Sequence, residues 1–360
     1  MTETFDLAIL DASPLKEAVA FARCNSDIAI SRLSLGTTFT QLANFRNQID
    51  RSLRGKEKER LSITELTAYG HKLFNFCIQD EIARLYSRLS NGQVRIHILS
   101  NQPELREIPW EYWQEPAHTP GPRIDRSIVR IVPIIGQPPP VPLEVKQQVR
   151  VLFASAEPVD QEAVSWTDVR DEIESTFRAR LNRIGKFEFK AIDATTRASL
   201  LDAVTQESFD IFHFSGHGEI VKGIGHLILT DRKTRRSSRI RADELGQILG
   251  SRGIRLAVLS ACETATGNFI DDFSVVAETL IRAGIPAVVA NQLPIPDKTV
   301  ATFVEAMYRE LLNSGDIDRA VGEGRIRLSI DLGDSTNNAV LEWGIPTVYR
   351  HIAAAQILKI

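Results

Sequence analysis

The sequence predicts an α/β fold with a mostly parallel sheet that helices cover on both faces. After residue 145, short apolar segments alternate with helical segments of about ten to fifteen residues, which is typical of strand–helix–strand units. These apolar segments are nearly continuous, as expected for strands that are buried on both faces. A proline-rich stretch, "GQPPPVPLEV" at 136–145, precedes them and predicts a stiff connector. We therefore expect two domains, residues 1–145 and residues 146–360.

The first domain is predicted to be an α+β portion. "SITELTAYGHKLFNFCIQDEIARLYSRL" at 62–89 has apolar residues at helical spacing, which predicts one long amphipathic helix. Ser62 opens this segment and Glu65 follows three residues later, which is the spacing of a capping box. The strands predicted in this portion are 6–10, 27–35, 94–100 and 127–134.

The second domain is predicted as a regular succession of strands and helices. The predicted strands are 149–156, 187–193, 211–216, 254–262 and 287–295. The predicted helices are 167–185, 196–208, 241–250, 271–284 and 297–312. A short hairpin at 225–240 interrupts this succession.

Composition narrows the class of protein. The net charge of -3 and the 25% of charged residues do not favour direct nucleic-acid binding. Cys24, Cys77 and Cys262 are odd in number and far apart, which suits a reducing compartment rather than a disulfide framework. The chain begins without a signal-peptide pattern, and its longest apolar runs are too short to cross a bilayer. We therefore expect a cytoplasmic protein with no membrane association.

Two of the predicted strands end on reactive side chains. One strand, "IFHFSGHG", reaches His217, and another, "LAVLSAC", reaches Cys262. Sites in parallel sheets form beyond the carboxyl ends of the strands, so neighbouring strands would bring imidazole and thiol to one edge. Gly216 and Gly218 flank the imidazole and are expected to let the chain turn sharply there.

This pair of residues suits thiol-based hydrolysis. A free thiol is mostly protonated at neutral pH, and an adjacent imidazole can take its proton. The thiolate then attacks a carbonyl, and the imidazolium protonates the leaving amine. We expect the backbone N–H groups of Gly218 and Cys262 to stabilise the oxyanion. The sequence offers no carboxylate with an orienting role, so we expect a His217/Cys262 dyad.

Simpler interpretations compete with this one. A cysteine at a strand end is often a buried hydrophobe, as we expect for Cys77. His213, inside its strand, is expected to be a hydrogen-bonded core histidine rather than a second catalytic group. The two histidines of "HFSGH" resemble a zinc pair, but that spacing requires a helix, which this segment does not favour. We therefore expect no metal and no cofactor.

The motifs "HFSGHG" and "LSACETA" resemble the CHAT family of caspase-like cysteine peptidases. Further stretches resemble that family in the same order, including "IPWEYW", "RVLFASAEP", "LIRAGIPAVVANQLPIPD" and "WGIPTVYR". The resemblance implies a caspase- or separase-like sheet, with His217 as general base and Cys262 as nucleophile. It also implies that residues 1–145 are catalytically silent, and that the protein is an effector in a bacterial defence or programmed-death system.

The resemblance also bears on specificity. Several relatives in the caspase clan carry an acidic residue two positions before the cysteine, which favours a basic P1 side chain. Ser260 occupies that position here, so we expect a P1 preference that is not strictly basic. Asp271 and Asp272 are the candidates for supplying negative charge to the substrate pocket instead.

We expect an endopeptidase that cleaves a specific protein partner and is controlled from outside itself. Two alternatives remain open, namely a caspase-like scaffold with an unused dyad and a non-peptidase hydrolase such as an amidase. "ETATGNFIDD" at 263–272 is the expected regulatory loop, which a protein partner or self-association would bring into register. The basic segment 231–241 is a solvated hairpin in the simplest interpretation, and otherwise the docking arm for that partner.

Overall fold

The computed structural model describes the chain in segments. The described residues are 4–12, 17–34, 36–54, 60–89, 93–99, 105, 108–116, 118, 121–134, 140–144, 148–161, 166–181, 186–260, 273–293, 295–331 and 339–360. Cys262, Asp271 and Asp272 lie outside them, as does the expected regulatory loop.

The chain forms two compact units, and each is described by itself. Unit 1 comprises Met1–Ile131 with Arg325–Gly344, and unit 2 comprises Val132–Gly324 with Ile345–Ile360. Compact packing does not test which segments fold independently, so the domain border predicted at residue 145 stays a prediction.

Unit 1 is built on a five-stranded mixed sheet. Its strands are β1 (Thr4–Ala12), β2 (Glu17–Cys24), β3 (Asp27–Ser34), β4 (Gln93–Leu99) and β5 (Arg126–Ile131), in the order β3-β2-β1-β4-β5. Its helical elements are α1 (Thr37–Arg54), α2 (Ile63–Cys77), α3 (Asp80–Tyr86), the 3₁₀ turn η2 (Trp110–Tyr112) and α11 (Ala339–Glu342). The first three strands pair antiparallel, whereas β4 runs parallel to both β1 and β5.

The helix predicted over 62–89 is broken in the structure. The capping box is confirmed, since the Ser62 hydroxyl accepts from the Glu65 N–H and the Glu65 carboxylate accepts from the Ser62 N–H. However, α2 ends at Cys77 and α3 begins at Asp80, whose φ of 46° lies in the left-handed region. The apolar spacing continues across this break, which is why periodicity alone predicts a single helix.

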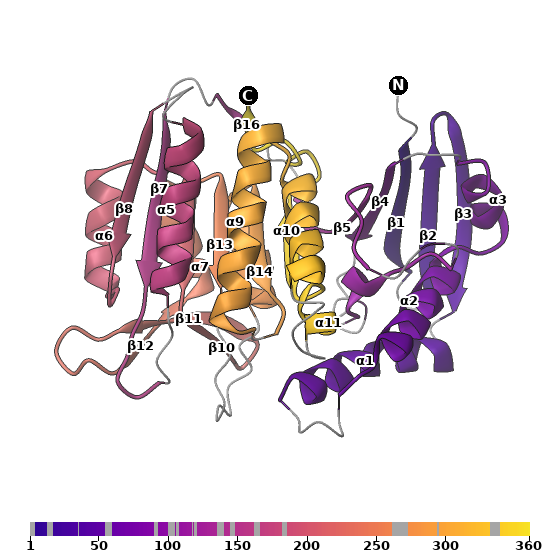
Figure 1. Ribbon diagram of the computed structural model, residues 1–360, viewed down its shortest axis with the longest axis horizontal. Coiled ribbons are helices and arrows are strands. Elements are labelled where there is room, and N and C mark those ends of the chain that lie inside the picture. The colour runs from indigo at the N-terminus through magenta and orange to yellow at the C-terminus, as the bar shows by residue number, and fades with distance from the viewer. Residues whose placement is uncertain are drawn as a thin grey trace. The chain divides into compact units, whose positions relative to one another are not determined.

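Unit 2 contains the elements that position the predicted site (Figure 1). Its strands are β6 (Leu143–Glu144), β7 (Val149–Ser155), β8 (Phe187–Ile192), β9 (Ile211–Ser215), β10 (His217–Val221), β11 (Ile224–Thr230), β12 (Ser237–Arg241), β13 (Leu256–Ser260), β14 (Ala287–Asn291), β15 (Pro346–Arg350) and β16 (Leu358–Lys359). Its helices are α5 (Thr167–Leu181), α6 (Arg197–Gln206), α7 (Ala242–Gly250), α8 (Ser274–Arg282), α9 (Asp297–Ser314) and α10 (Ile317–Asp331), the last of which continues into unit 1.

The main sheet of unit 2 is mostly parallel, as predicted. Its strand order is β15-β14-β13-β9-β7-β8, and only β15 pairs antiparallel, with β14. The strands β14, β13, β9, β7 and β8 run in one direction, so their carboxyl ends meet at one edge. The remaining short pair, β6 and β16, places part of the predicted connector in a strand.

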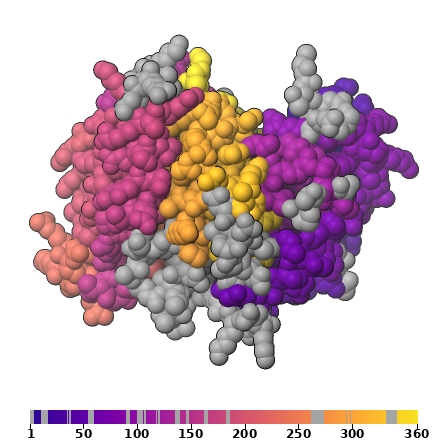
Figure 2. Space-filling view, in the orientation of Figure 1, coloured from indigo at the N-terminus to yellow at the C-terminus, as the bar shows by residue number. Residues whose placement is uncertain are grey.

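Helices cover both faces of this sheet. On one face, Leu152 and Phe212 belong to a buried cluster with residues of α6, α7 and α8. The alternate residues Phe153 and His213 point to the opposite face, where His213 contacts Tyr308 of α9. Figure 1 shows α5, α9 and α10 on this side of the sheet, and the central strands β9, β13 and β14 are buried along their whole length. The space-filling view of the same side is given in Figure 2.

A three-stranded antiparallel sheet, β10-β11-β12, lies at the carboxyl-end edge of the main sheet in Figure 1. Only Gly216 separates β9 of the main sheet from β10. The hairpin predicted at 225–240 is therefore confirmed, with an additional strand that begins at His217.

Candidate active site

The two strands that carry the predicted dyad are direct neighbours. β9 and β13 pair in parallel, with Ser215 opposite Ser260 at their carboxyl ends. His217 follows Ser215 by two residues, just as Cys262 follows Ser260 by two residues. The expected adjacency of the strands is confirmed, while the position of Cys262 lies outside the described residues.

His217 is the first residue of β10 and is 3% exposed. The imidazole at the end of β9 is therefore almost completely buried. Gly216, the residue before His217, is held against β13, because its N–H donates to the Ser260 carbonyl at 3.2 Å. This bond joins the last residue of β13 to the residue before the imidazole.

The glycines beside His217 are required by packing rather than by left-handed backbone. Neither Gly216 nor Gly218 has a positive φ. A Cβ on Gly216 would lie 2.8 Å from the Phe214 ring, and one on Gly218 would overlap the ring of Phe273. Phe273 is fully buried and directly precedes α8. Its ring therefore packs against the strand that begins at His217.

His213 is a hydrogen-bonded core histidine, as the sequence predicts. It is fully buried, and its Nδ1 lies 3.0 Å from the Tyr308 hydroxyl while its Nε2 lies 3.2 Å from the Ser260 hydroxyl. Burial lowers the pKa of His213 to about 3, so the imidazole is neutral at physiological pH. His213 therefore bridges α9, β9 and β13 instead of exchanging protons.

Three serines form a row across the carboxyl ends of adjacent strands. Ser155 of β7, Ser215 of β9 and Ser260 of β13 are opposite one another in the parallel register, and all three are buried. The hydroxyls of Ser155 and Ser215 have no hydrogen-bond partner within the described segments. Of this row, only Ser260 is held through its hydroxyl, by His213.

The residues predicted for the substrate pocket are only partly described. Ser260 lies at the end of β13, where the sequence places it, and is 3% exposed. Asp271 and Asp272 lie outside the described residues, so their contribution of negative charge stays a prediction. The pocket itself also stays a prediction.

A buried carboxylate near His217 escapes the sequence interpretation. Glu219 is 5% exposed and lies two residues after His217 on β10, so both side chains share one face of that strand. The Glu219 carboxylate is paired with the guanidinium of Arg239 on β12. Strand alternation is the signal that identifies Glu219, once His217 is known to begin a strand.

Cys24 and Cys77 are the cysteines of the described region, and both are buried. Burial raises the pKa of the Cys77 thiol, which suits the inert core role predicted for it. The described residues contain no group of three or more His, Cys, Asp or Glu side chains arranged to hold a metal ion. Among the described helices, none has the length and apolarity needed to cross a bilayer.

The basic hairpin is partly neutralised by its own neighbours. Arg236 pairs with Asp160, Arg239 with Glu219, and Arg241 with Asp243. The turn is also ordered, because the Asp231 carboxylate accepts from the N–H groups of Lys233 and Thr234. The cations at its tip are exposed residues, namely Arg232, Lys233 and Arg235.

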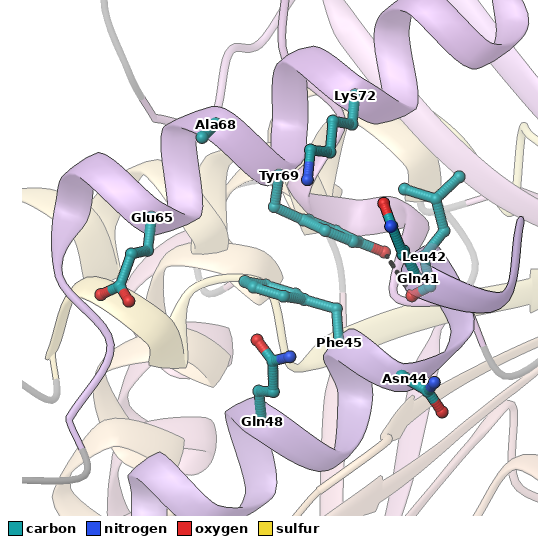
Figure 3. Close-up of a pocket in the computed structure, with 9 residues that line it drawn as sticks. All are labelled: Gln41, Leu42, Asn44, Phe45, Gln48, Glu65, Ala68, Tyr69 and Lys72. Carbon is teal, nitrogen blue, oxygen red and sulfur yellow. Dashed lines mark hydrogen bonds between the residues drawn. The ribbon is translucent and has the colours of Figure 1, made fainter. Parts of the chain in front are cut away.

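Unit 1 contains a separate pocket between α1 and α2, with a volume of about 390 Å³ (Figure 3). The rings of Phe45 and Tyr69 stack at 3.8 Å, and the Tyr69 hydroxyl donates to the Leu42 carbonyl at 3.2 Å. Its nine lining residues are Gln41, Leu42, Asn44, Phe45, Gln48, Glu65, Ala68, Tyr69 and Lys72. This set has no cysteine or histidine, so thiol–imidazole chemistry cannot occur there.

Known proteins resemble this chain in sequence and in structure. The family model described as CHAT domain matches residues 67–351. In the Saccharomyces cerevisiae separase–securin complex at 3.0 angstrom resolution, one chain aligns with a TM-score of 0.51 and 12% identity, covering 97% of this chain and 30% of that chain. A search of curated proteins found no match.

Two further structures align at lower scores. A chain of the complex of Porphyromonas gingivalis RgpB pro- and mature domains aligns with a TM-score of 0.46 and 10% identity, covering 89% of this chain and 78% of that chain. The Drosophila initiator caspase Dronc aligns with a TM-score of 0.37 and 10% identity, covering 60% of this chain and 83% of that chain. The predicted α/β fold with a mostly parallel sheet is confirmed, and the protein spans about 30% of the separase-complex chain, which it resembles in fold.

Proposed function

Since the chain belongs to the CHAT domain family, we propose that it is a cysteine endopeptidase in which His217 and Cys262 form the catalytic dyad. The single observation that carries this proposal is the pairing of β9 with β13, with Ser215 opposite Ser260. Each member of the dyad follows its strand by the same two residues. Covalent geometry limits the Cα of Cys262 to about 7 Å from that of Ser260.

The proposed reaction uses the side chains in fixed roles. His217 removes the proton from the Cys262 thiol, and the thiolate attacks the carbonyl carbon of the scissile peptide bond. The imidazolium then protonates the leaving amine, and water hydrolyses the resulting thioester. The backbone N–H groups of Gly218 and Cys262 are the proposed oxyanion donors.

The closeness of Gly218 to Phe273 supports this proposal. Phe273 directly follows segment 261–272, and its ring occupies the space of a side chain at Gly218, beside the strand that begins at His217. Ser260 directly precedes that segment, and its carbonyl accepts from the Gly216 N–H. The described residues on either side of the segment that contains Cys262 thus both contact neighbours of His217 in the chain.

The proposed substrate is a specific protein partner, cleaved in the cytoplasm as part of a bacterial defence or programmed-death response. Family resemblance supports this role, and the separase neighbour was solved with a protein bound, securin. Ser260 and the carboxylates of Asp271 and Asp272 are the proposed specificity residues. A peptide library would test them, because absolute selection of Arg or Lys that survives Asp271→Asn and Asp272→Asn contradicts this part.

Cleavage of candidate protein partners tests the proposed activity. The wild-type chain is incubated with proteins encoded beside it, and we expect one to be cut at a single position. Cys262→Ala abolishes the cut, and His217→Gln slows it about 10²–10⁴-fold, the usual contribution of a general base. Cleavage that continues undiminished in Cys262→Ala contradicts the proposal.

One observation favours the alternative of a non-catalytic scaffold. His217 is only 3% exposed, which restricts access of a substrate to the imidazole. We account for this burial by control from outside the chain, in which a protein partner or self-association opens the site. A scaffold instead predicts that no partner accelerates cleavage and that Cys262→Ala binds its partners unchanged.

The tip of the basic hairpin is the proposed docking point for that activating partner. Arg236 is unsuitable for testing it, because this side chain pairs with Asp160. Arg232→Glu with Lys233→Glu changes exposed charges only, and we expect it to weaken activation while Cys262 remains equally reactive. Full activity of the isolated monomer would contradict external control.

A further inference from the structure

A row of residues crosses the three-stranded sheet from His217 and ends on an arginine. Ile228 of β11 lies opposite His217, and Arg239 of β12 lies opposite Ile228. Directly opposed residues project from the same face of a sheet, so the His217 imidazole and the Arg239 guanidinium share one face. Neighbouring strands are about 4.8 Å apart, which puts the Cα atoms of His217 and Arg239 about 10 Å apart.

The exposure of the side chains increases along this row. His217 and Ile228 are each 3% exposed, whereas the Arg239 side chain is 58% exposed. The opposite face of the sheet packs on the core through three buried apolar residues, namely Leu227, Leu229 and Ile240. Arg239 is therefore the first exposed charge in the row that begins at the imidazole.

A buried carboxylate fixes the direction of the Arg239 guanidinium. Glu219, on the same face, accepts a hydrogen bond from Nε of Arg239 and another, at 3.2 Å, from Nη2. The Glu219 side chain is only 7% exposed, and a buried carboxylate without its cation is costly, so Arg239 is held over it. Nη1 of Arg239 has no acceptor among the described residues. The guanidinium edge formed by Nη1 and the second N–H of Nη2 can thus bind another group.

The next arginine on the same face is held differently. Arg241 pairs with Asp243, which follows it by two residues, and their side chains are 52% and 50% exposed. An exposed pair of this kind contributes little and does not fix the direction of the guanidinium. Arg241 is therefore a matched control for Arg239.

We propose that Arg239, oriented by Glu219, is a specificity residue that binds an acidic side chain of the protein substrate. A guanidinium edge with two N–H groups matches the two oxygens of a carboxylate. An extended peptide advances about 3.3 Å per residue, so a span of about 10 Å places the acid about three residues from the bond cleaved beside His217. Arg239 contacts substrate, and Glu219 is a positioning residue. This inference rests on the proposed function.

The experiment incubates the full chain with a randomised synthetic peptide library and maps the cut sites by mass spectrometry. For the wild type, we expect Asp or Glu about three residues from the cut to be favoured about tenfold, the usual effect of one charge-assisted hydrogen bond. Glu219→Gln with Arg239→Gln should abolish this selection without leaving a buried charge unpaired. Arg239→Lys should keep part of it, because an ammonium keeps the charge but not the planar fork. Arg241→Gln should keep all of it.

Glu219→Gln alone separates orientation from simple attraction between charges. This variant makes the sheet face more positive while it removes the group that directs Arg239. If Glu219 orients the guanidinium, the selection of acids weakens, and cleavage of peptides without the acid stays at the wild-type rate. If charge alone mattered, the selection of acids would become stronger.

Several outcomes separate this inference from the proposed function. Wild-type cut sites without selection of acids overturn it, as does selection that survives the double variant or is lost equally in Arg241→Gln. Stronger selection in Glu219→Gln overturns the positioning role of Glu219. If the double variant does not fold, Arg239→Lys against Arg241→Lys decides the question.

A protein substrate gives the same test if the peptides are too short to be cut. Each acid beside the cut site of the cleaved partner is then changed to alanine, and only the one about three residues away should matter. If neither a peptide nor a partner is cut, or if cleavage continues undiminished in Cys262→Ala, the proposed function itself fails and this inference fails with it.

Discussion

Both units bury an ion pair, and unit 2 also buries a neutral hydrogen-bonded chain near its strand ends. In unit 1, the carboxylate of Glu111 and the guanidinium of Arg130 face each other at 3.0 Å, and their side chains are 0% and 5% exposed. In unit 2, Asp318 and Arg350 pair at 2.8 Å and are similarly buried. Near the ends of β9 and β13, by contrast, His213, Tyr308 and Ser260 form a buried chain of neutral groups that ends two residues before the proposed nucleophile.

A buried ion pair and a buried chain of neutral groups have different effects on the residues around them. A buried ion pair is costly to break because the remaining charge is uncompensated, so it suits a unit that holds its shape. Neutral donors and acceptors can orient a neighbouring group without perturbing its charge. The N-terminal portion is predicted to be catalytically silent, and each of the following changes compares it with the strand ends of unit 2.

The largest effect is expected from Glu111→Gln in unit 1. This change removes the Glu111 carboxylate from the buried guanidinium of Arg130, which should cost about 3–5 kcal/mol in the free energy of unfolding. Urea denaturation measures the loss, while the cleavage rate per folded molecule should stay at the wild-type value. Glu81→Gln, in the exposed pair with Arg84, is the control and should cost under about 1 kcal/mol. Equal losses from the two variants would contradict the contrast.

Acid should destabilise the protein through His213. Its pKa is lowered to about 3 in the folded state, whereas the unfolded imidazole has its ordinary value near 6.5. The unfolded chain therefore binds the extra proton between these values, so the contribution is complete above about pH 6.5 and is lost as pH falls. The slope from this one group is about 1.4 kcal/mol per pH unit.

Denaturation at several pH values between 6.5 and 5 measures that slope. His213→Gln should be less stable at neutral pH. On acidification, its free energy of unfolding should fall less steeply than that of the wild type, by about 1.4 kcal/mol per pH unit. A variant that keeps the wild-type slope would show that His213 is not the group responsible.

A smaller effect is expected from two glycines that pack against aromatic rings. A Cβ on Gly218 of unit 2 would overlap Phe273, and a Cβ on Gly344 of unit 1 would overlap Tyr112. Either glycine changed to alanine should cost about 1–3 kcal/mol through overpacking. Only Gly218→Ala should also slow cleavage, because its neighbour is His217. Loss of activity per folded molecule in Gly344→Ala would contradict a silent unit 1.

Much of the unit 2 architecture could be predicted because each strand and helix has its own local pattern. The apolar segments that end at Ser215 and Ser260 predicted two parallel strands, and the structure confirms that β9 and β13 are neighbours. The capping box at Ser62 was equally local and is confirmed.

What could not be predicted depends on contacts between distant residues. Tyr308 lies 95 residues after His213, so no local pattern marks it as the partner of the imidazole. His217 is buried because the chain turns from β9 into β10 at Gly216. The flanking glycines predicted a sharp turn there, but they did not indicate in which direction the chain would turn. The strand β2 and the helix α1 were also absent from the prediction, although β2 has a clear alternation of buried residues.

The central claim is that β9 and β13 bring His217 and Cys262 together as a working dyad. Limited alkylation of the native protein tests it most directly, because Cys24 and Cys77 are buried internal standards in the same chain. With iodoacetamide at neutral pH, we predict stoichiometric labelling of Cys262 well before Cys24 or Cys77, and slower labelling of Cys262 in His217→Gln. Equal labelling rates for Cys262 and Cys77 in folded protein, or a Cys262 rate unaffected by His217→Gln, would contradict the account.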